Sequence, residues 1–168
     1  FNAKSGQLQS DNILFVLQDS GKRVWIGTDR GLYYWKDNAL QCVDKSHYFQ
    51  RAYRFKDKTC FITIEGEIWT ADKKGRLAFA AKLPDVSYGL DLPGNLAVGS
   101  QWVIFTSEGS FVFDTESNML KPSPSEWNIP GGEVSVDNRG NYWVHNKTGK
   151  LYYIQSETGV VKGFQLML

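Results

Sequence analysis

The sequence predicts an all-β protein assembled from four units of one design. Each unit has a strand-like run with an aromatic residue, a polar turn with a glycine, and a second apolar and aromatic run. The turn glycines recur about every 40 residues, and they are Gly31, Gly66, Gly109 and Gly149. A period of this length built only from strands is typical of β-propeller blades, because each small sheet must stack on its neighbours to bury its faces.

The first unit shows the design most fully, as a meander of four strands joined by short turns. Its expected strands are Ile13 to Gln18, Val24 to Thr28, Leu32 to Trp35 and Leu40 to Asp44. Polar residues and glycines separate these runs at the spacing that hairpins prefer. The first unit is therefore expected to form one four-stranded antiparallel blade.

The other three units repeat the same order of strands. Their expected strands are 52–55, 60–64, 67–71 and 76–83, then 96–98, 102–106, 110–114 and 119–121, then 133–136, 142–146, 150–154 and 160–166. No helical periodicity is sustained over ten or more residues. The sequence thus predicts four blades with approximate extents 13–44, 51–83, 95–121 and 133–166.

Composition limits the class of protein. The chain has 168 residues, of which 42% are hydrophobic and 14% aromatic, so it can bury one packed core. The formal net charge of +1 gives no electrostatic reason to expect nucleic acid or an anionic membrane as a partner. No apolar run approaches the roughly 20 residues that span a bilayer, so direct membrane contact is not expected. Because the chain opens on Phe1 and not on Met, we expect a processed or excised fragment.

The first and fourth units carry a motif that resembles the two-component regulator propeller repeat. In the first unit the motif residues are Leu17-Gln18-Asp19-Ser20-Gly21, Trp25-Ile26-Gly27-Thr28 and Gly31-Leu32-Tyr33. In the fourth they are Asp137-Asn138-Arg139-Gly140 and Tyr142-Trp143, after which Val144-His145-Asn146 departs from the pattern. The second and third units keep only the aromatic strand and the turn glycine.

This resemblance implies a sensor segment from the periplasmic part of a hybrid two-component system, of the kind that gut Bacteroidetes use to detect glycan breakdown products. It implies a partial propeller whose partners are the remaining blades and the downstream domains of a parent protein. It also implies an oligosaccharide ligand and a kinase outside this chain. The repeat defines the architecture of a blade and not a ligand site, so it assigns no functional residue to this chain. The segment itself is expected to have no enzyme activity and no cofactor.

Candidate ligand-binding residues come from the turns between second and third strands and from the loops between units. Both kinds of loop are expected on one face of a propeller, where they vary without cost to the core. Sugar recognition needs aromatic rings together with polar or charged groups. The residues of this face that combine these properties are Arg30, His47, Tyr48, Tyr88, Trp127 and Lys147.

Catalytic and metal-binding interpretations are weaker. Asp19 and Asp137 occupy equivalent positions before turns, so we expect each carboxylate to bind N–H groups of its own turn. His47 and His145 lack a serine or cysteine in a nucleophile setting. The two cysteines have no second ligand at metal spacing, so no metal site is predicted.

Packing explains the large apolar residues in the second strands. Trp25, Phe61, Val103 and Trp143 are expected at equivalent positions, where they pack neighbouring blades together. Cys42 and Cys60 are expected as two small core residues that form no disulfide.

Two other functions stay open at this point. The same face could dock another protein without any small ligand, as an interaction scaffold, or the chain could be a propeller lyase or glycosidase. The apolar outer faces of the end units could also be covered in a compact four-bladed ring or by pairing of two chains as a homodimer.

Overall fold

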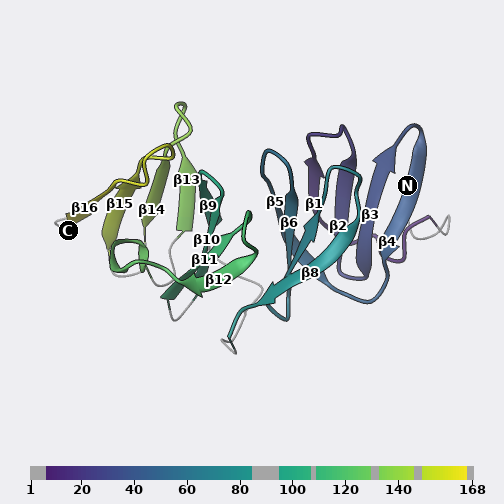
Figure 1. Ribbon diagram of the computed structural model, residues 1–168, viewed down its shortest axis with the longest axis horizontal. Helices are drawn as coiled ribbons and strands as arrows, with labels where there is room; N and C mark the ends of the chain where they lie inside the picture. The colour runs from purple at the N-terminus through teal and green to yellow at the C-terminus, as the bar shows by residue number, and fades with distance from the viewer. Residues whose placement is uncertain (1–6, 85–94, 107–108, 130–132, 146–148, 166–168) are drawn as a thin grey trace. The chain divides into compact units, whose positions relative to one another are not determined.

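Four separate antiparallel sheets make up the protein. The computed structural model describes residues 7–84, 95–106, 109–129, 133–145 and 149–165. Within these residues each sheet has four strands whose order in space follows their order in the chain. Figure 1 shows the strands along the chain from the N-terminus to the C-terminus. The predicted all-β fold of four four-stranded antiparallel blades is confirmed.

The chain divides into two units, and residues 1–82 form the first. Sheet 1 consists of β1 (Ile13–Gln18), β2 (Val24–Thr28), β3 (Gly31–Lys36) and β4 (Ala39–Asp44). Sheet 2 consists of β5 (Phe49–Arg54), β6 (Thr59–Thr63), β7 (Glu67–Ala71) and β8 (Leu77–Lys82).

Residues 83–168 form the second unit. Sheet 3 consists of β9 (Asn95–Val98), β10 (Gln101–Thr106), β11 (Gly109–Asp114) and β12 (Met119–Pro122). Sheet 4 consists of β13 (Glu133–Val136), β14 (Tyr142–His145), β15 (Lys150–Ile154) and β16 (Val161–Gln165). A 3₁₀ turn, η1 (Ser125–Trp127), lies between the two sheets in the sequence. No helical segment among the described residues is long and apolar enough to cross a bilayer.

Aromatic rings hold sheets 1 and 2 together. Trp25 from β2 and Phe61 from β6 are fully buried, and their ring centroids lie 4.9 Å apart in an edge-to-face arrangement. Phe49 joins them, with its ring 6.1 Å from that of Phe61. Such pairs stabilise by about 0.5–1.5 kcal/mol beyond the area they bury. Trp25 and Phe61 therefore pack neighbouring sheets together, as the sequence predicted.

The two residues are nevertheless not at equivalent positions, which corrects the alignment of the repeats. Because Trp25 and Phe61 contact each other, they lie on facing surfaces of adjacent sheets. The hydroxyls of Thr28 and Thr63 both bind backbone groups around their turns. When the two units are aligned on these threonines, the residue equivalent to Trp25 is Cys60 and not Phe61. Side chains alternate between faces along a strand, so a slip of one residue reverses the assigned face.

Trp143 and Cys42 also differ from expectation. The residues of β14 that enter the core of the second unit are Tyr142 and Val144, and the half-buried Trp143 lies on the opposite face of sheet 4. Cys42 is exposed on β4, whereas Cys60 is buried, so only one of the two cysteines is a core residue; both are free thiols.

The aspartates of the hairpin turns bind their own turns, as predicted. Asp19 Oδ1 accepts the Arg23 N–H at 3.0 Å, and Asp137 Oδ1 accepts the Asn141 N–H at 2.9 Å. Arg23 is itself buried and donates from its guanidinium to the carbonyl of Lys73 at 2.8 Å. Because Lys73 lies in the turn after β7, this bond ties sheet 1 to sheet 2.

Candidate functional site

The segment that joins sheet 1 to sheet 2 passes across two strand turns. The carbonyl of Tyr48 accepts the Ile64 N–H at 3.0 Å, at the turn between β6 and β7. Gly31, at the start of β3, approaches the end of β4 so closely that a Cβ there would lie 2.4 Å from the Asp44 carbonyl oxygen. Its φ of +129° also favours glycine. Residues 44–48 therefore bring together loops from one end of both sheets.

His47 is held at this end between two carboxylates. Its Nδ1 lies 3.0 Å from Asp44 Oδ2, and its Nε2 lies 3.6 Å from Glu67 Oε2. The imidazole centroid is 5.9 Å from the Phe49 ring and 5.0 Å from the Trp69 ring. We call Asp44, His47, Phe49, Glu67 and Trp69 the His47 cluster. It joins β4, the connecting segment, β5 and β7.

Hydrogen bonds fix the two carboxylates. Burial acts to raise the pKa of Asp44, but the backbone N–H and ring of His47 and the N–H of Ser46 donate to the carboxylate and lower its pKa overall. Glu67 Oε2 accepts the Trp69 indole N–H at 3.2 Å. Both carboxylates are thus anchored as hydrogen-bond acceptors before any ligand arrives.

The His47 cluster is partly exposed to solvent. The side chains of His47, Glu67 and Asp44 are 30%, 23% and 15% exposed, and Trp69 is half-buried. A ligand can therefore reach one side of these groups. A carboxylate lies beside each ring nitrogen of His47, but only the 3.0 Å contact with Asp44 is a hydrogen bond, because 3.6 Å from Nε2 to Glu67 is too long for one.

The structure places the predicted ligand-binding residues in different parts of the protein and does not bring all of them together. His47 belongs to the cluster, and the half-buried Tyr48 follows it against the β6–β7 turn. Arg30 is exposed in the turn between β2 and β3, next to Gly31. Tyr88 and Lys147 lie outside the described residues.

Trp127 has a structural position. It is 8% exposed and packs in the core of the second unit with Phe105 and Ile129. Its indole N–H donates to the Gly159 carbonyl at 3.1 Å. Its ring therefore has little open surface for a sugar.

Sequence reasoning missed four members of the cluster: Asp44, Phe49, Glu67 and Trp69. A signal for two of them was present, since Glu67 and Trp69 are two residues apart on an expected strand and so share a face. Asp44 was visible only as the end of a strand, three residues before His47. Its role depends on the turn that brings its carboxylate back to the imidazole.

Three further observations concern the other cysteine, histidine and acidic side chains among the described residues. Burial raises the pKa of the Cys60 thiol to about 12, so it is not a thiolate nucleophile. His145 Nε2 lies 3.5 Å from Glu133 Oε2 on an open surface, where both side chains are more than half exposed. No group of three or more His, Cys, Asp or Glu in the described ranges could hold a metal ion.

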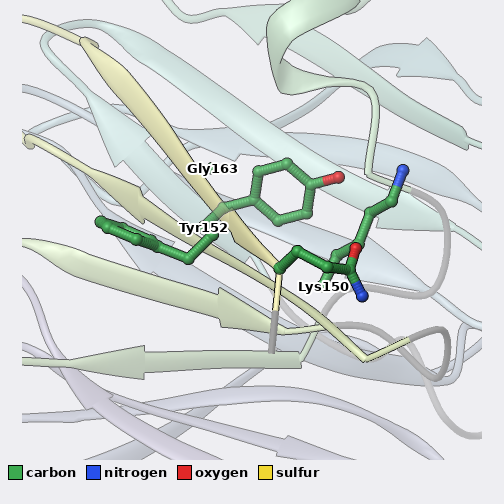
Figure 2. Close-up of a pocket in the computed structure, with 5 residues that line it drawn as sticks. Lys150, Tyr152 and Gly163 are labelled. Carbon is green, nitrogen blue, oxygen red and sulfur yellow. The ribbon is translucent and has the colours of Figure 1, made fainter. Parts of the chain in front are cut away.

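A shallow hollow lies on β15 and β16. Figure 2 shows Tyr152 and Lys150 beside Gly163 on these strands. The residues that line the hollow are Lys150, Tyr152, Gly163, Phe164 and Gln165. Its volume of about 240 Å³ is below the range of about 300–1,000 Å³ usual for ligand pockets. The His47 cluster is therefore the candidate site considered further.

No protein-family model matches this chain, and no curated protein sequence matches it. Solved structures with the same arrangement of strands do exist. The Neurospora crassa Pan2 WD40 domain has a TM-score of 0.64 at 11% identity, and the match covers 95% of this chain and 51% of that one. Virginiamycin B lyase from Staphylococcus aureus has a TM-score of 0.63 at 14% identity, covering 92% of this chain and 55% of that one.

A third similar structure is the extracellular domain of the putative hybrid two-component system BT4673 from B. thetaiotaomicron. Its TM-score is 0.61 at 16% identity, and the match covers 96% of this chain and 23% of that one. The chain thus spans about half the length of the first two structures and about a quarter of the third. At these identities the likeness shows the fold, which is that of β-propeller blades.

Proposed function

We propose that this chain is a non-catalytic, extracytoplasmic sensor segment of a two-component signalling protein, and that it binds oligosaccharides. The observation that carries the proposal is the His47 cluster. There, the connecting segment places the His47 imidazole between the carboxylates of Asp44 and Glu67 and 5.0 Å from the Trp69 ring, and Tyr48 follows His47 in the same segment.

The chemistry of this site suits a sugar. A flat aromatic ring can cover the C–H face of a pyranose, and carboxylate oxygens accept hydrogen bonds from its hydroxyls. Asp44 and Glu67 supply such acceptors, and Trp69 and Tyr48 supply the rings. The likeness to the extracellular domain of a hybrid two-component system, together with the Trp25-Ile26-Gly27-Thr28 motif, supports the assignment to sensing in the periplasm of a bacterium of the Bacteroidetes.

Calorimetric titration of the purified chain with a panel of oligosaccharides tests this function. We expect at least one glycan to bind, and Trp69→Ala or Tyr48→Ala to weaken that binding by about 1–3 kcal/mol, as loss of an aromatic anchor does. Met119→Ala is the matched control, because Met119 is an exposed apolar side chain of the other unit. Failure of every glycan to bind would favour an interaction scaffold instead.

Turnover is tested on the same samples, because virginiamycin B lyase shares the fold. We expect no cleavage of any bound glycan, since neither His47 nor His145 has a serine or cysteine in a nucleophile setting. Glycan cleavage that is lost in His47→Ala or His145→Ala would show an enzyme and overturn the non-catalytic assignment.

A further inference from the structure

Sheet 4 carries an aromatic patch on the face that points away from its own core. Residues paired directly across antiparallel strands share a face, and Trp143 pairs with Tyr153, whose other partner is Lys162. One step along the same face, Leu151 pairs with Phe164. The Trp143 ring lies 5.0 Å from Tyr153 and 6.1 Å from Phe164. We call Trp143, Leu151, Tyr153 and Phe164 the outer patch.

The outer patch is open to solvent. Phe164 is 47% exposed, and Trp143, Leu151 and Tyr153 are only half-buried. The opposite face of the same sheet enters the core through Tyr142, Val144 and Ile154. Sheet 4 is therefore apolar on both sides, which is unusual for a sheet with one side in water.

Sheet 1 contains the same arrangement, and there it is covered. Trp25 pairs with Tyr34 across β2 and β3, and their rings lie 5.2 Å apart at 64°. Trp143 and Tyr153 pair in the same way across β14 and β15, with rings 5.0 Å apart at 58°. In sheet 1 the aromatic pair is covered by sheet 2, and Trp25 has no exposed surface. The repeat thus shows what covers such a pair: another four-stranded sheet.

We infer that the outer patch is a homodimer interface, on which sheet 4 of a second copy packs face to face. The alternative partner within a second copy is the outer face of sheet 1. That face is already covered in part, because Leu8 is 3% exposed and packs on Ile26 and Tyr33, and the Tyr33 hydroxyl accepts the Gln9 N–H at 3.0 Å. The outer patch is thus better placed to pair with its own copy.

Charge complementarity supports this pairing. Glu133 on β13 and Lys162 on β16 lie on the same face as the outer patch, at opposite edges of sheet 4. A two-fold axis parallel to the strands places β13 of one copy over β16 of the other. Each Glu133 then faces the strand that carries Lys162 of the partner, and the aromatic rings meet in the centre. An apolar centre with a charged rim is the usual anatomy of an interface.

Analytical ultracentrifugation of the full chain tests the inference. We expect wild type to dimerise at micromolar concentration, and Trp143→Ser to weaken dimerisation at least about tenfold, as loss of a central aromatic anchor does. Phe79→Ser is the matched control, because Phe79 is an exposed aromatic residue of the first unit and should leave the dimer intact. A wild-type chain that stays monomeric, or a Trp143→Ser variant that dimerises as well as wild type, would overturn the interface.

Charge exchange tests the pairing without touching the aromatic rings. Both side chains are exposed, so Glu133→Lys and Lys162→Glu should fold normally, which circular dichroism checks. Each variant alone places like charges across the interface and should be mainly monomeric. An equimolar mixture restores both opposite-charge contacts and should form a heterodimer. A mixture that stays monomeric would contradict the two-fold arrangement.

Discussion

Arg23 Nε donates to Asp19 Oδ2 at 2.7 Å, and the two side chains are only 3% and 4% exposed. The same aspartate accepts the Trp25 indole N–H at 2.9 Å. The rest of the guanidinium reaches the carbonyls of Asp72 and Lys73 in sheet 2. One buried ion pair therefore supports a turn, orients the central tryptophan and joins two sheets.

Removing the cation should cost much stability. Arg23→Met leaves Asp19 buried without its partner, which costs about 3–5 kcal/mol in the free energy of unfolding. Chemical denaturation at neutral pH measures this. Arg76→Met is a close control, because Arg76 Nε bonds Asp72 Oδ2 at the same 2.7 Å but the arginine side chain is 76% exposed. An exposed pair contributes at most about 1 kcal/mol. Equal losses in the two variants would contradict the role of burial.

Acid should remove the contribution of Asp19. Burial acts to raise the pKa of Asp19, but the bonds from Trp25 and Arg23 outweigh it and lower the pKa below its ordinary value. A carboxylate with a lowered pKa stabilises the fold above its unfolded pKa of about 3.9, and the contribution is lost as the pH falls. The difference in unfolding free energy between wild type and Asp19→Asn should therefore narrow from pH 6 to pH ~2. A constant difference would be inconsistent with this linkage.

The aromatic contact between sheets 1 and 2 should be a major source of stability in the first unit. Phe61→Ala leaves a cavity beside Trp25 and should lower the free energy of unfolding by about 3–5 kcal/mol. Phe79→Ala removes the same ring from a position that is 53% exposed, and should cost less than about 1 kcal/mol. Thermal melts of both variants make the comparison.

A glycine is required at position 27 because the Phe15 ring occupies the place of a side chain there, and not because the backbone needs an unusual conformation. A Cβ at Gly27 would lie 2.1 Å from the Phe15 ring, so Gly27→Ala should cost about 1–3 kcal/mol through overpacking. Gly163, also on a strand, would place a Cβ 3.5 Å from Tyr152, an ordinary contact. Gly163→Ala should therefore be nearly neutral. If Phe15→Leu fails to relieve the cost of Gly27→Ala, the steric explanation is wrong.

Trp127 should contribute to the stability of the fold and not to ligand binding. Trp127→Ala removes a buried ring from the second unit and should cost about 3–5 kcal/mol. Trp127→Phe keeps most of the packing but loses the hydrogen bond to Gly159, and should cost less. Unfolding curves decide this, and an unchanged stability of Trp127→Ala would show that the ring is not part of the core.

Local pattern was enough to predict the blades. Strand runs, turn glycines and the Asp-led turns all depend on residues close in sequence. The hairpins of sheet 1 and the bonds of Asp19 and Asp137 to their own turns could therefore be anticipated. Even here, the repeat position assigned to Phe61 was wrong, because the repeat alone does not reveal a slip of one residue in alignment.

The sequence by itself determined the all-β fold, the four-stranded meanders and the aromatic packing between blades, because period and turn chemistry are local properties. Only the tertiary structure decided which side chains meet. Asp44 and Glu67 come from different sheets yet flank one imidazole, and Trp127 turned out to lie in the core. Trp25 and Trp143 occupy equivalent positions in the repeat, but sheet 2 covers Trp25 completely, whereas Trp143 is only half-buried. The burial of a side chain depends on what packs against its face of the sheet, and this is not encoded in the repeat itself.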